Sequence, residues 1–242
     1  MHPDRTLREK VLIQEFQDFH RTAVGKFVQS VAADLPAGTT LIDAGAGEGM
    51  YRHLFPHVRY VALDYGVGDA GWDYTGLDAV CDLHALPLKD NSVPFILCTQ
   101  TLEHLNRPQL ALSEMFRVLS VGGTIYCTLP FIGDAHHQEP YDFFRYTRYA
   151  DEYLFGKAGF RDIEVTPIGG YNTLLISLLQ KGVYRFIERN ARRRVIIRYL
   201  LVFLQRVAFV ILRWLNRFAW GLDRRDEYRY RFALGFTVKA RK

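Results

Sequence analysis

The fold of this chain is decided by residues 41–49, Leu41-Ile-Asp43-Ala-Gly45-Ala-Gly47-Glu-Gly49. An apolar run that is typical of a buried strand leads into a glycine-rich turn, after which a helix is expected to begin. Glycine adopts positive φ angles without strain and lets a ligand approach the backbone closely. The stretch therefore predicts a ligand-binding loop, although a glycine run of this kind also fits a tight turn that binds nothing.

Acidic residues follow the next two predicted strands. A strand at 60–63 leads into Asp64, 17 residues after Gly47, and a strand at 79–82 ends in Asp82, before Leu83. Parallel strands bring their carboxyl ends to one edge of a sheet, where open α/β sheets bind ligands. We expect Asp64 to bind the ribose hydroxyls of an adenosine ligand. The Asp82 carboxylate and the Leu83 backbone N–H are expected at an adenine edge. Taken singly, Asp64 also suits a helix cap and Asp82 a turn.

Strands and helices alternate along most of the chain, which predicts a parallel sheet covered on both faces. Apolar residues recur at helical spacing from residue 7 to residue 35, before Pro36 and Gly38 break the pattern. Further helices are expected at 108–119 and 147–158. The remaining strands are expected at 40–43, 95–99, 124–129, 162–165 and 232–240.

Five segments resemble class I S-adenosylmethionine-dependent methyltransferases, in particular their small-molecule, type 11-like branch. They are 43–49 (Asp-Ala-Gly-Ala-Gly-Glu-Gly), 81–92, 99–105 (Thr-Gln-Thr-Leu-Glu-His-Leu), 114–123 and 235–239. The first is similar to motif I of that family, which binds the methionine part of the cofactor. Pro94 and the Ser120-Val121 pair depart from the usual pattern. A dinucleotide dehydrogenase is the competing interpretation of the glycine loop, but Met50 does not suit its Gly-x-Gly-x-x-Gly signature.

This resemblance implies a doubly wound, Rossmann-like α/β fold. Its sheet would have seven strands with an antiparallel last strand, and a C-terminal helical insertion would interrupt the domain. The implied activity is methyl transfer from S-adenosylmethionine to a small or lipid-linked acceptor. The expected cofactor-binding residues are Asp43, Gly45, Gly47, Gly49, Asp64, Tyr65, Asp82, Leu83 and Gln100.

The loop after the fifth strand concentrates titratable and aromatic residues. It contains His136, His137 and Asp142, which we take as candidates for acceptor binding or proton removal. Related bacterial methyltransferases carry a similar His-x-x-Pro-x-Asp-Phe-Phe-Arg-Tyr-Thr stretch. The alternative is a capping loop whose polar side chains fix its own backbone. We expect no metal, because adjacent side chains on an extended segment, such as His136 and His137, point in opposite directions.

Composition divides the chain into two parts of opposite charge. Residues 181–231 hold 14 Lys or Arg against 4 Asp or Glu, whereas the rest of the chain holds 17 against 22. The three cysteines lie in or beside predicted strands, which favours buried thiols in a reducing compartment. We therefore expect a cytoplasmic protein with one strongly basic segment.

Residues 171–231 predict a basic, apolar helical insertion. In a helix over 195–220, Arg198, Gln205, Arg206, Arg213, Asn216 and Arg217 fall within an arc of about 120°. The rest of the circumference is apolar, which favours a peripheral contact of residues 192–220 with the inner face of an anionic membrane. A hairpin buried against its own domain or in a homodimer would hide the same apolar face. The apolar runs are too short to span a bilayer.

Three regions follow from these patterns. Residues 1–38 form an N-terminal helical cap, 39–170 with 232–242 form the cofactor-binding domain, and 171–231 form the insertion. A non-catalytic, cofactor-binding regulatory module is the first alternative function. A nucleic-acid methyltransferase is the second, but the insertion alternates arginines with aliphatic runs and no base-flipping motif is present. We expect no nucleic-acid partner.

Overall fold

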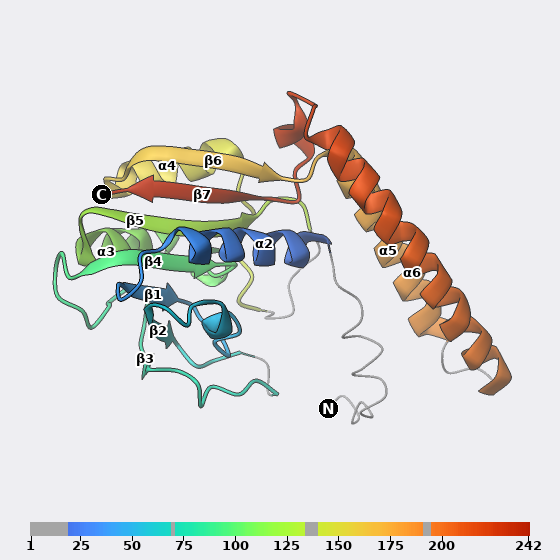
Figure 1. Cartoon of the computed structure of the whole chain (residues 1–242), viewed down its shortest axis with the longest axis horizontal. Coiled ribbons are helices and arrows are strands. Elements are labelled where there is room, and N and C mark those ends of the chain that lie inside the picture. Colours follow the sequence, from blue (N-terminus) through green and yellow to red (C-terminus); the bar gives the residue numbers. More distant parts are fainter. Residues whose placement is uncertain (1–18, 69–70, 134–139, 191–194) are drawn as a thin grey trace.

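One seven-stranded sheet forms the centre of the protein, with strand order β3-β2-β1-β4-β5-β7-β6. The computed structural model describes residues 19–68, 71–133, 140–190 and 195–242 (Figure 1). The strands are β1 (Thr40–Ala44), β2 (Arg59–Asp64), β3 (Ala79–Val80), β4 (Val93–Thr99), β5 (Leu119–Pro130), β6 (Arg161–Ile168) and β7 (Gly235–Arg241). The helices are α2 (Phe19–Asp34), α3 (Pro108–Val118), α4 (Arg148–Ala158), α5 (Tyr171–Asn190) and α6 (Val195–Asp223), with short 3₁₀ turns η1 (Arg52–Leu54), η2 (Leu102–His104) and η3 (Arg229–Phe232).

The direction of the strands confirms the predicted fold class. β1 pairs in parallel with both β2 and β4, and β4 pairs in parallel with β5. β7 is antiparallel to β5 and to β6. β6 therefore runs in the same direction as the other parallel strands, and its carboxyl end lies at the same edge of the sheet as theirs.

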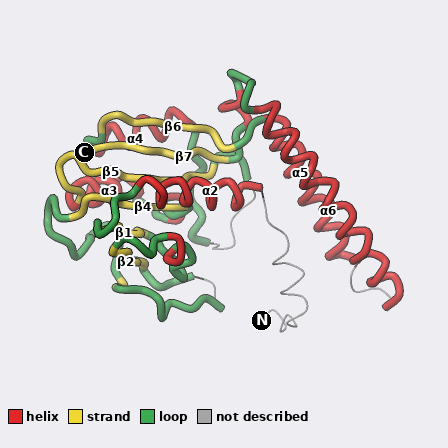
Figure 2. The backbone as a smooth tube through the Cα atoms, in the orientation of Figure 1, coloured by secondary structure: helices red, strands yellow, loops and turns green. Residues whose placement is uncertain are grey.

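Helices cover both faces of this sheet, because successive strand residues point to opposite sides. On one face, Leu41 and Leu97 pack with α2. On the other, Ile42 and Ile96 pack with α3 and α4. Figure 2 shows these helices lying along the strands. Because both faces of the sheet are covered, successive residues of a central strand are all buried. The predicted strands are therefore nearly continuous apolar runs.

The strands lie where they are predicted but their bounds differ, with β6, for example, spanning Arg161–Ile168 where 162–165 is predicted. β3 contains two residues, so Asp82 lies beyond it and not at its end. β5 begins at Leu119, directly after α3, because that residue pairs with Val93. β7 begins only at Gly235, since the preceding segment forms the η3 turn. A register shift between Val93 and Phe95 brackets Pro94, which has no N–H to donate to the sheet.

The helices α5 and α6 form a hairpin that projects from the domain (Figure 1). Two residues separate its first helix from the end of β6, so it leaves the sheet at the carboxyl edge. At its base, the rings of Phe19 and Trp220 lie 5.3 Å apart, which joins α2 to α6. No helix in the described ranges combines the length and the apolar content that crossing a membrane would require.

Candidate functional site

The glycine loop after β1 is held against the end of β2 by its backbone. Gly45 N–H and Ala46 N–H both donate to the Leu63 carbonyl, at 2.8 and 3.0 Å. Gly45 has φ +83°, and a Cβ there would collide with the side chain of Thr101. Only glycine therefore fits this position, which lies between β1 and the end of β4.

Asp64 connects this loop to the turn after β2. Its Oδ2 accepts the Gly47 N–H at 2.9 Å, and its Oδ1 accepts the Gly66 N–H at 2.8 Å. A carboxylate has about four lone-pair sites, so each oxygen can still accept a ligand hydroxyl. The structure thus brings the predicted ribose-binding acid beside the glycine loop. The neighbouring Tyr65 is exposed.

Asp43, at the carboxyl end of β1, is a buried acid with one unused oxygen. The residue is 1% exposed, and Tyr60 donates its hydroxyl hydrogen to Oδ2. Oδ1 has no hydrogen-bond partner among the described residues. Burial raises the pKa of this carboxyl to about 7. A buried, unsatisfied acceptor is costly unless a ligand completes it, and a cationic group nearby would stabilise the ionised form.

Asp82 forms a turn beyond β3. Its Oδ1 accepts the His84 backbone N–H at 2.9 Å and the His84 Nδ1–H at 2.7 Å. The backbone hydrogen bond is the main cause of a lowered pKa of this carboxyl. About half of the side chain is exposed, and Leu83 beside it is buried. Asp82 therefore stabilises a turn, as the alternative interpretation of this residue expected. Its role at the adenine edge stays a prediction.

The end of β4 carries a second buried acid. Gln100 adopts φ +49°, and its N–H donates to the Thr128 carbonyl at 3.0 Å. Three residues later, Glu103 is fully buried, and neither of its carboxylate oxygens has a hydrogen-bond partner in the described part of the chain. Burial raises the pKa of Glu103 to about 8. This carboxyl is therefore largely protonated at neutral pH.

The segment after β5 is tied to the same place by its backbone. The Glu103 carbonyl accepts the N–H groups of Phe143 and Phe144, at 2.9 and 3.3 Å. Tyr146 donates its hydroxyl hydrogen to the Leu102 carbonyl at 2.9 Å. Residues 140–147 consequently lie against η2, at the carboxyl end of β4.

Asp142 and Arg145 form a two-pronged ion pair within this segment. The two guanidinium N–H groups donate to the two Asp142 oxygens at 2.7 and 2.8 Å. The Asp142 side chain is 8% exposed. Close by, His104 Nδ1–H donates to the Tyr141 carbonyl at 2.5 Å, and burial lowers the pKa of this imidazole. The candidate bases His136 and His137 lie outside the described residues.

Sequence reasoning located the acids that follow strands but missed their partners. It did not single out Tyr60, Thr101 or Glu103, because these residues act through contacts between separate strand ends. Tyr60 and Asp43 are 17 residues apart in the chain but are diagonal neighbours on the paired strands β1 and β2, where Asp43 lies opposite Ala62. An acid beside a histidine just after a strand, as in Glu103-His104, was the one local signal.

Comparison with known proteins matches residues 42–127 to a family described as a methyltransferase domain. A 110-residue stretch is 30% identical to an uncharacterized methyltransferase of Mycobacterium bovis and covers 42% of this chain and 43% of that protein. A 100-residue stretch is 36% identical to a probable S-adenosylmethionine-dependent methyltransferase of Mycolicibacterium smegmatis and covers 39% of each. The chain thus spans less than half the length of these curated relatives.

Two solved structures show the same fold over nearly the whole chain. One is a SAM-dependent methyltransferase from Archaeoglobus fulgidus, with TM-score 0.58, 14% identity and coverage of 92% of this chain and 94% of that one. The other is the [4+2]-cyclase SpnF, with TM-score 0.56, 16% identity and coverage of 92% and 82%. Because one of the two is described as a cyclase, the fold alone does not fix the reaction.

Proposed function

Since this chain belongs to the class I S-adenosylmethionine-dependent methyltransferases, we propose that it moves a methyl group from S-adenosylmethionine to a small-molecule or lipid-linked acceptor. One observation carries the proposal. The Asp64 carboxylate joins the glycine loop to the turn after β2, while Asp43 at the adjacent strand end keeps one buried oxygen without a partner in the described residues.

The residues present suit each part of the cofactor. The glycine loop and Asp43 would bind the methionine part, whose amino group is cationic. Asp64 would accept the ribose hydroxyls, with Tyr65, Asp82, Leu83 and Gln100 completing the set. S-Adenosylmethionine supplies the methyl group, and its sulfur keeps the electron pair of the broken bond.

Residues around η2 and 140–147 would receive the acceptor. They lie at the carboxyl end of β4, beside Thr101, which contacts the glycine loop. For a hydroxyl or carbon acceptor, a base among His136, His137 and Asp142 would take the proton. Most of the rate would come from holding the acceptor in line with the methyl group in a dry site.

The purified full chain is expected to convert S-adenosylmethionine into S-adenosylhomocysteine when given a cell extract. We would separate the extract into lipid and aqueous fractions and quantify the product by mass spectrometry, with reactions that lack the protein as the control. Turnover with the lipid fraction supports a lipid-linked acceptor, and turnover with the aqueous fraction supports a small molecule. Cofactor binding without turnover in either fraction would indicate a regulatory module instead.

Cofactor affinity is expected to rise severalfold from about pH 6 to about pH 7.5 and then level off. The pKa of Asp43 is about 7 in the ligand-free protein, and the ionised form binds a cation better. Below this pKa, binding must therefore release a proton. Calorimetry in buffers of different ionisation enthalpy measures that release. The Asp43→Asn variant should bind more weakly and with little pH dependence, and an unchanged pH profile would assign the titration to another group.

The proposed function also assigns a role to each of the three regions of the chain. We propose a helical cap over 1–38, of which residues 1–18 lie outside the described residues, a methyltransferase domain over 39–170 and 232–242, and a helical insertion over 171–231. We propose that residues 192–220 contact the cytoplasmic face of the membrane peripherally, with a homodimer as the alternative occupant of that surface. We expect no nucleic-acid partner.

A further inference from the structure

Several polar side chains are buried where α5 meets α6. Asn216 on α6 donates its side-chain N–H to Gln180 on α5 at 3.1 Å, and both residues are 7% exposed. At the base, the carboxylate of Asp223 accepts the backbone N–H groups of Asn172 and Thr173, at 3.1 and 2.8 Å. The acid that ends α6 thus caps the beginning of α5, and polar contacts hold the two helices together.

The outward faces of this hairpin are apolar. Leu175 and Leu179 on α5 are about half exposed, while Trp214 and Phe218 on α6 are 66% and 67% exposed. On each helix these residues fall on the side away from the buried polar side chains, at 100° per residue. In a water-soluble hairpin the apolar side chains lie between the helices and the polar ones face water. Here the apolar side chains are exposed, which indicates an interaction surface. Because the two apolar faces point away from one another, a single flat partner would cover only one of them.

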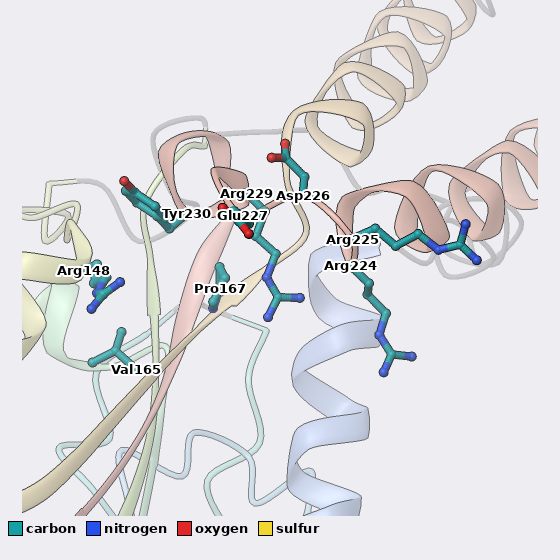
Figure 3. A pocket seen from close by; sticks show the side chains of 9 residues that line it. All are labelled: Arg148, Val165, Pro167, Arg224, Arg225, Asp226, Glu227, Arg229 and Tyr230. Carbon is teal, nitrogen blue, oxygen red and sulfur yellow. The ribbon is translucent and has the colours of Figure 1, made fainter.

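A cavity of about 440 Å³ lies where the hairpin meets the sheet. Val165 and Pro167 of β6 line it, and Figure 3 shows Arg148 on one side of Pro167 with Arg224 and Arg229 on the other. Its charged lining residues are Arg148, Arg224, Arg225, Arg229, Asp226 and Glu227.

The four arginines of the lining outnumber its two acids, Asp226 and Glu227, so the cavity carries an excess of positive charge. Within the described ranges, no ion pair joins Arg224, Arg225 or Arg229 to a carboxylate. Asp226 instead accepts the Tyr228 backbone N–H at 2.8 Å. Arg148 is paired with Glu152 at 2.8 Å, outside the cavity lining. The cavity is thus suited to an anion, and guanidinium groups match the geometry of phosphate oxygens.

The cavity also lies at the functional edge of the sheet. β6 ends at this edge, as do the strands that carry the glycine loop and Asp64. Arg148 begins α4, directly after the segment 140–147 that rests on η2. A molecule bound between Arg148 and Arg229 would therefore lie on the side from which an acceptor reaches the cofactor.

We propose that this cavity binds the phosphate of an anionic lipid headgroup, while the apolar faces of α5 and α6 lie in the surrounding lipid. Charge complementarity favours this occupant over a second copy of the chain, because the copy would bring the same basic cavity to the contact. The Arg217 guanidinium lies 5.5 Å from the Trp214 ring centre, a pair suited to the boundary between headgroups and acyl chains. The inference rests on the proposed function for its purpose, which is to bring a lipid-linked acceptor to the cofactor.

Vesicle flotation of the full chain, without cofactor, tests the proposal. Binding to vesicles of phosphatidylcholine with phosphatidylglycerol is expected to exceed binding to phosphatidylcholine alone by about tenfold or more, and to fall with added salt. The double variant Arg224→Gln, Arg229→Gln should lose about tenfold or more on the anionic vesicles. The double variant Trp214→Ser, Phe218→Ser should lose binding to both kinds of vesicle. Soluble glycerol 3-phosphate should compete with the anionic vesicles.

The matched control is the double variant Arg59→Gln, Arg161→Gln. It removes the same charge from the amino-terminal ends of β2 and β6, at the opposite edge, and should bind as the unchanged protein does. Circular dichroism would establish that each variant is folded.

Equal binding by the Arg224/Arg229 variant, or equal affinity for the two kinds of vesicle, would overturn the lipid-phosphate site. A dimer that ignores vesicles, or binding of inorganic phosphate without vesicle binding, would also overturn it. Since no cofactor is added, none of these outcomes bears on methyl transfer itself.

Discussion

Replacing Asp64 by alanine is expected to lower the affinity for S-adenosylmethionine by about tenfold or more, from the loss of ~1.4–3 kcal/mol. Two effects act together. The ligand loses the carboxylate proposed to bind its ribose, and Gly47 N–H and Gly66 N–H lose the oxygens that they donate to at 2.9 and 2.8 Å. The glycine loop would then no longer be fixed to the turn after β2. Isothermal calorimetry with S-adenosylmethionine and S-adenosylhomocysteine measures the change.

The control for this experiment is Asp90→Ala. Asp90 also pairs through its carboxylate, with Arg117 at 2.6 Å, but its side chain is 68% exposed and precedes the amino-terminal end of β4. Cofactor affinity should not change in this variant. If Asp64→Ala is folded and binds the cofactor as tightly as the unchanged protein, Asp64 does not bind the ribose.

The sheet was predictable because each of its strands is defined locally. Leu41 and Ile42 point to opposite faces and both are buried, so a strand covered on both sides reads as a continuous apolar run. The glycine loop was predictable for a similar reason, since the position of Gly45 excludes any side chain. The length of β3 was not, because an edge strand has one neighbour and two residues are enough for its pairing with β2.

Residues that act through contacts between segments escaped sequence reasoning. Nothing in the sequence around Glu103 states that residues 143 and 144 will donate to its carbonyl and help enclose it. The helical wheel grouped Asn216 with the arginines of the insertion, yet the structure buries Asn216 in the α5–α6 seam. The helical periodicity of a sequence shows which residues share a polar face. It does not show whether that face contacts water or another helix.

A second large effect, a loss of turnover, is expected from a substitution in the segment 140–147. Asp142→Ala should reduce turnover by about a hundredfold or more, while cofactor affinity stays within about threefold. The carboxylate accepts both Arg145 N–H groups and is 8% exposed, so its loss leaves a guanidinium charge without its main partner. The acceptor side of the site would then lose its geometry, whereas the cofactor residues lie on other strand ends. Single-turnover kinetics and calorimetry measure the two quantities separately.

A double-variant cycle distinguishes the two roles that remain for Asp142. If Asp142 positions the segment through Arg145, then Arg145→Ala should cost about as much turnover as Asp142→Ala, and the double variant should be no worse than either. If Asp142 is instead the base, Arg145→Ala should leave part of the activity and shift its pH profile, because the neighbouring cation is gone. Asp90→Ala supplies the control, since it removes an exposed carboxylate from Arg117, which keeps its bonds to Glu114 and to the Leu86 and Leu88 carbonyls, and should leave turnover unchanged. Loss of cofactor binding in Asp142→Ala would place the segment in the cofactor site and contradict both roles.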